Sequence, residues 1–492
     1  MHSLKLKMII LLAAGLAACI QDPSQIVAPP CESGTYEAQR RCVEGKWGQD
    51  DVGPTDAGHD TTNDVASIED VVASHDASHD ASHDAGLDAS NDAELDANDA
   101  SQDASAPDVC VPRSCASPGL SCASTDDGCG QPLVCGAPTC VRHVALGASH
   151  SCAVLRDGQV YCWGRNADFE SGSLDTSNRL TPSLVPNVLA TSMGLGRHHS
   201  CAASLQGGVL CWGRNSNGQL GRPSADSVRQ AEAHPIPDLS GEIVAVAGGE
   251  DQACAQRGTD VFCWGEGGSY RLGNDSLDSI HQPIISISDA THFAIGHYHG
   301  CARRSNAEVW CWGSAENLQN GHLTPQTTPA RVDALSNNTT SLGSGRYHAC
   351  SIKSDGALWC WGRNEFGQLG SIGADTATPV KVSGFSNQTR VLMVTGGTGH
   401  TCALSSEGAA WCWGQNGASQ LGDGTYEPSR APRSVVDLPQ PASFIASGWD
   451  HNCAIDAQAQ LWCWGQNNLG QLGDGTNDNR NRAVKVSFPE PG

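Results

Sequence analysis

Cysteine and histidine recur at fixed places along the chain, and both residue types can do chemistry. Cysteine forms disulfides or binds metals, and histidine acts as an acid, a base or a metal ligand. The triplet Cys-Trp-Gly begins at Cys162, Cys211, Cys263, Cys311, Cys360, Cys412 and Cys463. A second cysteine precedes each triplet, at Cys152, Cys201, Cys254, Cys301, Cys350, Cys402 and Cys453. The regular pairing indicates a repeated unit that carries its own cross-link.

The residues between the two cysteines of a unit predict a β-hairpin. In the first unit, apolar runs meet at Asp157-Gly158, and a three-residue loop with glycine in the left-handed conformation places Cys152 opposite Cys162. The third unit is one residue shorter, and a two-residue Gly258-Thr259 loop restores the same opposition. Facing positions in an antiparallel pair have the separation that a disulfide requires. We therefore expect seven disulfides: Cys152–Cys162, Cys201–Cys211, Cys254–Cys263, Cys301–Cys311, Cys350–Cys360, Cys402–Cys412 and Cys453–Cys463.

A histidine stands three residues after a glycine at the start of most units. These residues are His150, His199, His299, His348, His400 and His451, and the third unit is expected to carry Asp251 in place of the histidine. A residue that recurs in this way most often serves each unit by bonding a local turn. A ring of metal-binding or catalytic histidines is the alternative, and we expect no bound metal ion and no cofactor.

The tryptophans of the repeated triplet predict packing. Alternation along a strand places Trp310 and Trp312 on one face and Cys311 on the other. A sheet with large rings on one face and disulfides on the other is buried on both sides. The residues expected to have this packing role are Trp163, Trp212, Trp264, Trp312, Trp361, Trp413 and Trp464.

The repeat length indicates the architecture. Successive Cys-Trp-Gly triplets are 48 to 52 residues apart, and each unit has room for four short strands. Seven such units predict an all-β, seven-bladed β-propeller over residues 141–492, with an open β-solenoid as the alternative. A glycine-bounded segment ending in Gly-Gln-Leu-Gly follows the triplet at 215–221, 364–370 and 467–473.

These residues resemble the regulator of chromosome condensation repeat family, whose unit has Gly-x-x-His, a glycine-containing hairpin, Trp-Gly and Gly-Gln-Leu-Gly. The resemblance covers residues 141–492 and implies a seven-bladed propeller. Units one, three and four lack a clean Gly-Gln-Leu-Gly, so we expect irregular outer loops there. The paired cysteines depart from the family's cytoplasmic and nuclear members. The founding member is a guanine-nucleotide exchange factor that docks on chromatin, and other members inhibit β-lactamase or serve as scaffolds.

The N-terminus predicts export and a lipid anchor. Residues 1–18 combine basic residues, an apolar core and small residues before Cys19, as in a signal peptide. Leu16-Ala17-Ala18-Cys19 resembles the bacterial lipobox, which implies diacylglycerol on Cys19; an ordinary signal peptide cut nearby is the alternative. Ile20, where retained enterobacterial lipoproteins have Asp, favours the outer membrane or cell surface.

Three segments separate this anchor from the repeats. Residues 19–49 hold a predicted Cys31–Cys42 disulfide loop, and residues 50–109 form a disordered Asp/Ala/Ser-rich linker. Between Asp50 and Asp108 there are 17 acidic residues and no Lys or Arg. Residues 110–140 form a small module with six cysteines, for which disulfides are expected and zinc is the alternative. Without Cys19, 22 of the 23 cysteines remain, an even number that suits an oxidising compartment.

Composition excludes several functions and leaves a binding module as the leading hypothesis. A net charge of −24 argues against nucleic-acid binding, and no stretch reaches the roughly 20 apolar residues of a membrane span. We expect a monomeric, membrane-tethered scaffold for unidentified protein partners at the cell envelope. Arg197, Tyr298, Arg346 and Trp449 differ between units and are the candidate binding residues. A hydrolase or lyase acting on glycans and a guanine-nucleotide exchange factor are the alternatives.

Overall fold

The computed structural model describes residues 125–126, 132–133, 139–222, 229–335, 337–386 and 388–489. The chain separates into two units, one made of Met1–Gly45 and Pro112–Gly492 and the other of Lys46–Val111, and every described residue belongs to the first. The predicted signal peptide, Cys19, the Cys31–Cys42 loop and the acidic linker lie outside the described residues. So does most of the six-cysteine module, in which β1 (Thr125–Asp126) pairs with β2 (Pro132–Leu133). Within the described ranges, no helix is long and apolar enough to cross a membrane.

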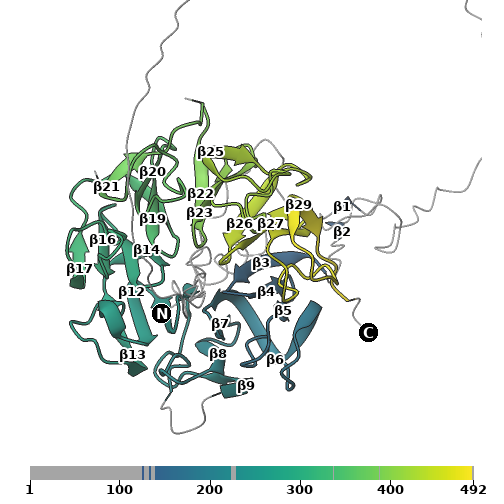
Figure 1. The fold of residues 1–492 in the computed structure, drawn as a ribbon. Coiled ribbons are helices and arrows are strands. Elements are labelled where there is room, and N and C mark those ends of the chain that lie inside the picture. Colours follow the sequence, from purple (N-terminus) through teal and green to yellow (C-terminus); the bar gives the residue numbers. More distant parts are fainter. Residues whose placement is uncertain are drawn as a thin grey trace, which may run out of the picture. The chain divides into compact units, whose positions relative to one another are not determined.

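Seven antiparallel blades, each of four consecutive strands, follow one another around an axis (Figure 1). Blade 1 contains β3 (Val141–Leu146), β4 (His150–Leu155), β5 (Gln159–Gly164) and the first half of β6 (Arg179–Leu195). The second half of β6 opens blade 2, which continues with β7 (His199–Ser204), β8 (Val209–Arg214) and β9 (Arg229–Pro235). The all-β, seven-bladed propeller predicted from the repeats is confirmed.

The other five blades have the same order. Blade 3 contains β10 (Ala245–Gly248), β11 (Gln252–Arg257), β12 (Asp260–Gly265), a 3-10 turn η4 (Gly268–Tyr270) and β13 (Ile280–Ile287). Blade 4 contains β14 (Ala290–Ile295), β15 (His299–Arg304), β16 (Val309–Gly313) and β17 (Gln326–Arg331). Blade 5 contains β18 (Thr339–Ser344), β19 (His348–Lys353), β20 (Leu358–Gly362) and β21 (Thr376–Lys381). Blade 6 contains β22 (Val391–Gly396), β23 (His400–Ser405), β24 (Ala410–Gly414) and β25 (Ser429–Ser434). Blade 7 contains β26 (Ala442–Ser447), β27 (His451–Asp456), β28 (Leu461–Gly465) and β29 (Arg480–Lys485).

The hairpin between the second and third strands has the predicted register in every blade. Cys152 faces Cys162, and Gly158 adopts a φ of 91°, the left-handed conformation expected at that turn. In the third blade, Arg257 pairs with Asp260 across a two-residue loop. All seven predicted disulfides are present, with Cα–Cα distances of 4.0–4.2 Å.

The ring closes between blade 7 and blade 1 without exchanging a strand. The Val141 amide donates to the Ala459 carbonyl at 2.8 Å, and β3 contacts β26 and β27. Apolar side chains of both blades, among them Leu146, Trp163 and Ile455, form one buried cluster at this seam. The first strands of neighbouring blades contact one another, so they line the axis.

The expectation of irregular outer loops is wrong for blades 1 and 4 and confirmed for blade 3. Where intact repeats have the first glycine of Gly-Gln-Leu-Gly at φ of 79° to 83°, these blades have Phe169, Tyr270 and Leu318 at φ of 58° to 64°. Blades 1 and 4 therefore keep the left-handed residue without glycine, whereas blade 3 adds a second left-handed residue, Ser269 at φ of 63°, within the η4 turn. Blade 6 does the same as blades 1 and 4, with Ser419 at φ of 67°.

A similar exchange in a hairpin turn gives a test of the repeat's backbone requirement. Ala307 occupies the turn of blade 4 at φ of 63°, where blades 1 and 5 have Gly158 and Gly356. Since a left-handed conformation costs an L-residue about 1–2 kcal/mol, Ala307→Gly should raise the free energy of unfolding by about 1 kcal/mol. Denaturant unfolding of the oxidised protein measures this. The matched exchange Gly356→Ala should lower stability, and a stabilising effect there would contradict the interpretation.

Candidate functional site

One face of the propeller carries the loops that differ most between repeats. In an antiparallel four-stranded blade, the loop after the first strand and the loop after the third strand emerge on the same side. The loops after the first strands surround the axis. In each of these loops, the two residues after the repeated glycine belong to what we call the axial mouth. The mouth consists of Ala148–Ser149, Arg197–His198, Glu250–Asp251, His297–Tyr298, Arg346–Tyr347, Thr398–Gly399 and Trp449–Asp450. Backbone bonds such as Arg197 N–H to Glu250 O and Arg346 N–H to Gly397 O, each 3.0 Å, join adjacent loops.

The seven triplet tryptophans lock each blade to its neighbour. Each is fully buried, and its indole N–H donates to the backbone carbonyl of the outer loop of the preceding blade at 2.9–3.2 Å. The acceptors are Gln471, Glu170, Gln219, Arg271, Gln319, Gln368 and Gln420. Trp163 bonds to Gln471, so the same interaction also closes the ring.

The repeated histidines reach the next blade rather than a local turn, which corrects the sequence expectation. His150 Nε2 lies 2.9 Å from Ser200 Oγ, whose hydroxyl donates to Glu170 O at 2.8 Å. Because that hydroxyl proton is already used, His150 must donate from Nε2. Burial lowers the pKa of His150 to about 3, which favours the neutral ring. Gly147 makes room for the ring, since a Cβ there would lie 2.5 Å from His150 Cε1.

Three further histidines make the same contact, which we call a His bridge. His348 bonds Thr401 at 2.8 Å, His400 bonds Asn452 at 2.9 Å, and His451 bonds Ser151 at 3.0 Å. In each case the bridging residue donates onward to the carbonyl that also accepts the tryptophan indole. These four histidines are therefore structural members of the blade junctions.

The third repeat needs a correction. Gln252, not Asp251, occupies the histidine position, because Gln252 pairs with Gly265 as His150 pairs with Gly164. Its side-chain amide donates to the carbonyls of Gly296 and His297 at 3.1 Å.

The two remaining histidines, His199 and His299, are fully buried. The residues that would complete His bridges from His199, Gln252 and His299 are Ala253, Gly300 and Ala349, which have no polar side-chain atom. The junctions of blades 2–3, 3–4 and 4–5 thus lack the bridge within the described chain.

A chain of polar side chains in the axial mouth spans those same three junctions. Arg197 Nη1 lies 3.5 Å from Glu250 Oε1, the Glu250 carboxylate contacts His297 Nε2, and Arg346 Nε donates to His297 Nδ1 at 2.8 Å. Arg271 adds to the chain, 4.0 Å from Glu250 and with its guanidinium 4.5 Å from the Tyr298 ring centroid. We call this series of contacting side chains the mouth chain. It connects blades 2, 3, 4 and 5, between which the His bridge is missing.

The four candidate binding residues are brought together here, but not as free surface anchors. Arg346 is 3% exposed and Trp449 is 4% exposed, whereas Arg197 and Tyr298 are partly exposed. The Arg197 guanidinium lies 5.9 Å from the Trp449 ring centroid, above the small Ala148 of the intervening blade. Sequence reasoning missed Glu250 and His297, although both stand at the same repeat position as Arg197 and Arg346.

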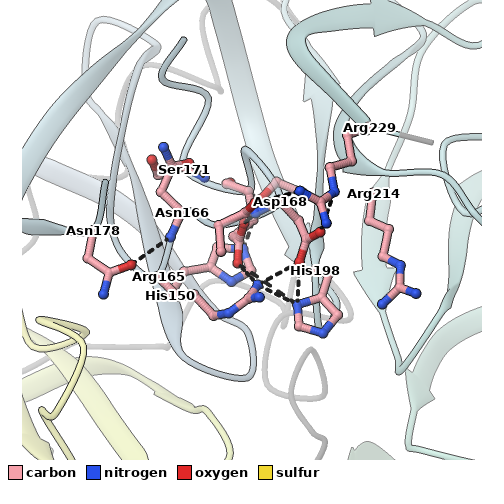
Figure 2. Close-up of polar contacts among 12 residues, drawn as sticks. His150, Arg165, Asn166, Asp168, Ser171, Asn178, His198, Arg214 and Arg229 are labelled. Atoms are coloured by element: carbon pink, nitrogen blue, oxygen red, sulfur yellow. Dashed lines mark hydrogen bonds and ion pairs between the residues drawn. The ribbon is translucent and has the colours of Figure 1, made fainter. Parts of the chain in front are cut away.

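An acidic cluster at the junction of blades 1 and 2 has metal-ligand residue types (Figure 2). Oxygen and nitrogen atoms of Asp168, Glu170 and His198 lie within 4.8 Å of one another. Arg165 Nη1 contacts all three, at 2.9 Å from Asp168 and 2.6 Å from His198 Nδ1, and Arg229 Nε lies 2.8 Å from Asp168. Burial, followed by Arg165, lowers the pKa of His198. Two arginines balance the two carboxylates, so this cluster is a salt-bridge network and a metal ion would have to displace Arg165.

The outer loops on the same face present single apolar side chains to solvent. Ile372 is 94% exposed and Leu323 is 82% exposed, each at the tip of a loop between the third and fourth strands. We call this set the apolar rim; its members are Leu174, Leu277, Leu323, Ile372 and Tyr426, from blades 1, 3, 4, 5 and 6. The sequence signal was one large apolar residue within each otherwise polar loop tip.

The repeats match known family models. Residues 206–256, 355–404, 407–455 and 458–491 match the regulator of chromosome condensation (RCC1) repeat, and a second model of that repeat matches 141–169, 190–219, 290–319, 340–368 and 443–471. The chain belongs to the RCC1 repeat family. The family named from the sequence motifs is therefore confirmed.

Its relatives have diverse functions. The ultraviolet-B receptor UVR8 of Arabidopsis thaliana is 30% identical over 366 residues, covering 72% of this chain and 71% of UVR8. The human E3 ubiquitin-protein ligase HERC2 is 29% identical over 246 residues, covering 48% of this chain and only 5% of HERC2.

Solved structures share the fold. Human WBSCR16 superimposes with a TM-score of 0.61 at 20% identity, covering 68% of this chain and 96% of WBSCR16. Yeast RCC1 (Prp20) bound to Kap60 superimposes with a TM-score of 0.60 at 20% identity, covering 67% and 84%.

The His bridge can be tested by removing one hydroxyl. Ser200→Ala leaves the buried His150 Nε2–H without its acceptor, so the free energy of unfolding should fall by about 1–3 kcal/mol in denaturant titration. Ser240→Ala, in the exposed connection after β9, is the control and should change stability by less than about 0.5 kcal/mol. Equal effects of the two substitutions would show that the bridge contributes nothing specific.

Buried neutral histidines also predict acid sensitivity. Burial lowers the pKa of His143, His150, His292 and His451 to about 3. The unfolded chain binds these protons near pH 6.5, so the stability they contribute is complete above that pH and is lost as the pH falls toward 3. Asp450, whose pKa burial raises to about 6, opposes part of the loss. The thermal unfolding midpoint should drop between about pH 7.5 and about pH 5, and an unchanged midpoint would contradict the assignment of neutral histidines.

Proposed function

We propose that this protein is a tethered extracytoplasmic scaffold that binds a protein partner on the face carrying the axial mouth and the apolar rim. One observation carries the proposal: repeat-invariant residues are buried in the blade junctions, while the repeat-variable mouth residues share a face with the five most exposed large apolar side chains. Aromatic residues and arginine, which several mouth positions carry, are enriched at protein interfaces.

Sequence features and relatives support the proposal. The predicted lipid anchor at Cys19 and the acidic segment 50–108 would hold the propeller away from a membrane. The cysteine pairing suits an oxidising compartment. Among the similar structures, yeast RCC1 is bound to Kap60, which supports a protein as the type of partner.

The two alternatives have less support. An exchange factor acts on a cytoplasmic GTPase, which a lipoprotein outside the cytoplasm would not meet. A hydrolase or lyase needs carboxylates available for acid–base chemistry, whereas Asp168 and Glu170 are paired with Arg165. Neither alternative gains a specific observation from the described residues.

Site-specific photo-cross-linking tests the proposal. A photo-reactive phenylalanine derivative is placed at Ile372, on the proposed face, or at Asp355, on the exposed hairpin turn at the opposite end of the same blade. In cells that make the full chain, Ile372 should give one discrete cross-linked product that excess unmodified protein competes away. Asp355 should give none.

Ile372 and Asp355 lie at opposite ends of one blade, so the difference in their cross-linking yields shows which face binds the partner. Products of equal yield from both positions would indicate non-specific contact. No competed product from Ile372, or from the same substitution at Leu323, would reject a partner on this face.

A further inference from the structure

Arg346 is a buried cation without an anionic contact in the part of the chain that the structure describes. Its Nε donates to His297 Nδ1 at 2.8 Å, and its guanidinium lies 4.4 Å from the Tyr347 ring centroid. No carboxylate lies within ion-pair distance of it among the described residues, and its Nη2 has no hydrogen-bond partner there. Burial lowers its pKa to about 10, whereas Tyr347, which is also hydrogen-bonded to it, and Asp450 raise its pKa. A buried charge normally has a paired counter-charge.

Trp449 provides a second unsatisfied donor in the axial mouth. It is 4% exposed, yet its Nε1 has no hydrogen-bond partner in the described structure, unlike the seven triplet tryptophans. Arg197, whose guanidinium lies 5.9 Å from the Trp449 ring centroid, has an Nε without a partner in the same region. Buried N–H groups without acceptors are uncommon in folded proteins.

The mouth has small residues on either side of Trp449. Ala148–Ser149 of blade 1 and Thr398–Gly399 of blade 6 stand where other blades carry arginine, histidine, glutamate or tyrosine. Arg346, Trp449 and Arg197 are the mouth residues of blades 5, 7 and 2, and each has a side-chain N–H without a hydrogen-bond partner in the described structure.

We propose that the axial mouth binds a single carboxylate group, which accepts hydrogen bonds from Arg346 Nη2, Trp449 Nε1 and Arg197 Nε. Arg346 has no carboxylate within ion-pair distance among the described residues, whereas Arg197 and Arg271 lie within 4.0 Å of Glu250. Because Glu250, Asp251 and Asp450 already bring carboxylates to the mouth, a singly charged anion is repelled less than a dianion. A phosphate dianion would leave an uncompensated negative charge close to Glu250.

The carboxylate can come from a free acid or from an acidic side chain of a partner. Binding of a small carboxylate does not require the proposed protein partner. Failure of one proposal therefore leaves the other standing.

The test uses the oxidised full chain with 5-fluorotryptophan in place of all 13 tryptophans. The 19F resonance lost in Trp449→Phe reports on the mouth. Addition of N-acetylglycine, or of the peptide acetyl-Ser-His-Asp-Ala-Ser-amide, should shift this resonance saturably. The neutral N-acetylglycinamide should not shift it.

Two arginine variants test whether the carboxylate binds at the axial mouth. Arg346→Gln should weaken binding about tenfold or more, the effect of losing a charge-assisted hydrogen bond. Arg304→Gln, which removes an arginine 4.4 Å from the Trp310 ring at the opposite end of blade 4, should leave binding unchanged. Equal binding by Arg346→Gln and the parent chain would overturn the proposal.

The two carboxylates distinguish the source. Saturation by N-acetylglycine indicates a free acid, saturation by the peptide alone indicates an acidic side chain, and either result supports the proposal. If neither shifts the resonance, or if only inorganic phosphate does, the carboxylate site is wrong.

Discussion

The hydrogen bond from each triplet tryptophan to the outer-loop carbonyl of the preceding blade is the contact on which the rest of the propeller depends. It buries the largest side chain of each repeat, satisfies the only polar atom of that side chain, and fixes the distance between neighbouring blades. Because Trp163 bonds to Gln471, the first and last repeats meet through the same interaction as any other pair. The ring can therefore close without sharing a strand between the two termini.

This shared carbonyl also explains why the residue before it has a positive φ in every outer loop. The carbonyl must point at the next blade, so the preceding residue is held in the left-handed region even when it is Phe169 or Leu318 rather than glycine. Where a His bridge is present, the same carbonyl accepts a second donor. Hydrogen bonding between blades thus constrains the backbone more strongly than local residue preference does.

The blade junctions fall into two groups, and the grouping bears on function. Junctions 5–6, 6–7, 7–1 and 1–2 have His bridges, whereas junctions 2–3, 3–4 and 4–5 are joined through the Arg197–Glu250–His297–Arg346 chain of the axial mouth. The mouth chain is therefore partly structural. Its unsatisfied donors on Arg346, Arg197 and the neighbouring Trp449 are what distinguish it from a purely structural network.

The sequence by itself determined the repeat, its hairpin register and the disulfide pairs, because these depend on spacing within about 50 residues and on the two-residue periodicity of strands. It also determined the family, since the motifs recur seven times. Only the tertiary structure decided what the repeated residues contact. The partners of His150 and Trp163 lie in other repeats, 50 and 308 positions away. Strand pairing places Gln252 at the histidine position, which the spacing from Gly249 and Cys254 also indicates. Likewise, Arg346 and Trp449 have residue types typical of surface anchors, but their burial follows from seven loops meeting at one axis, which no single repeat encodes.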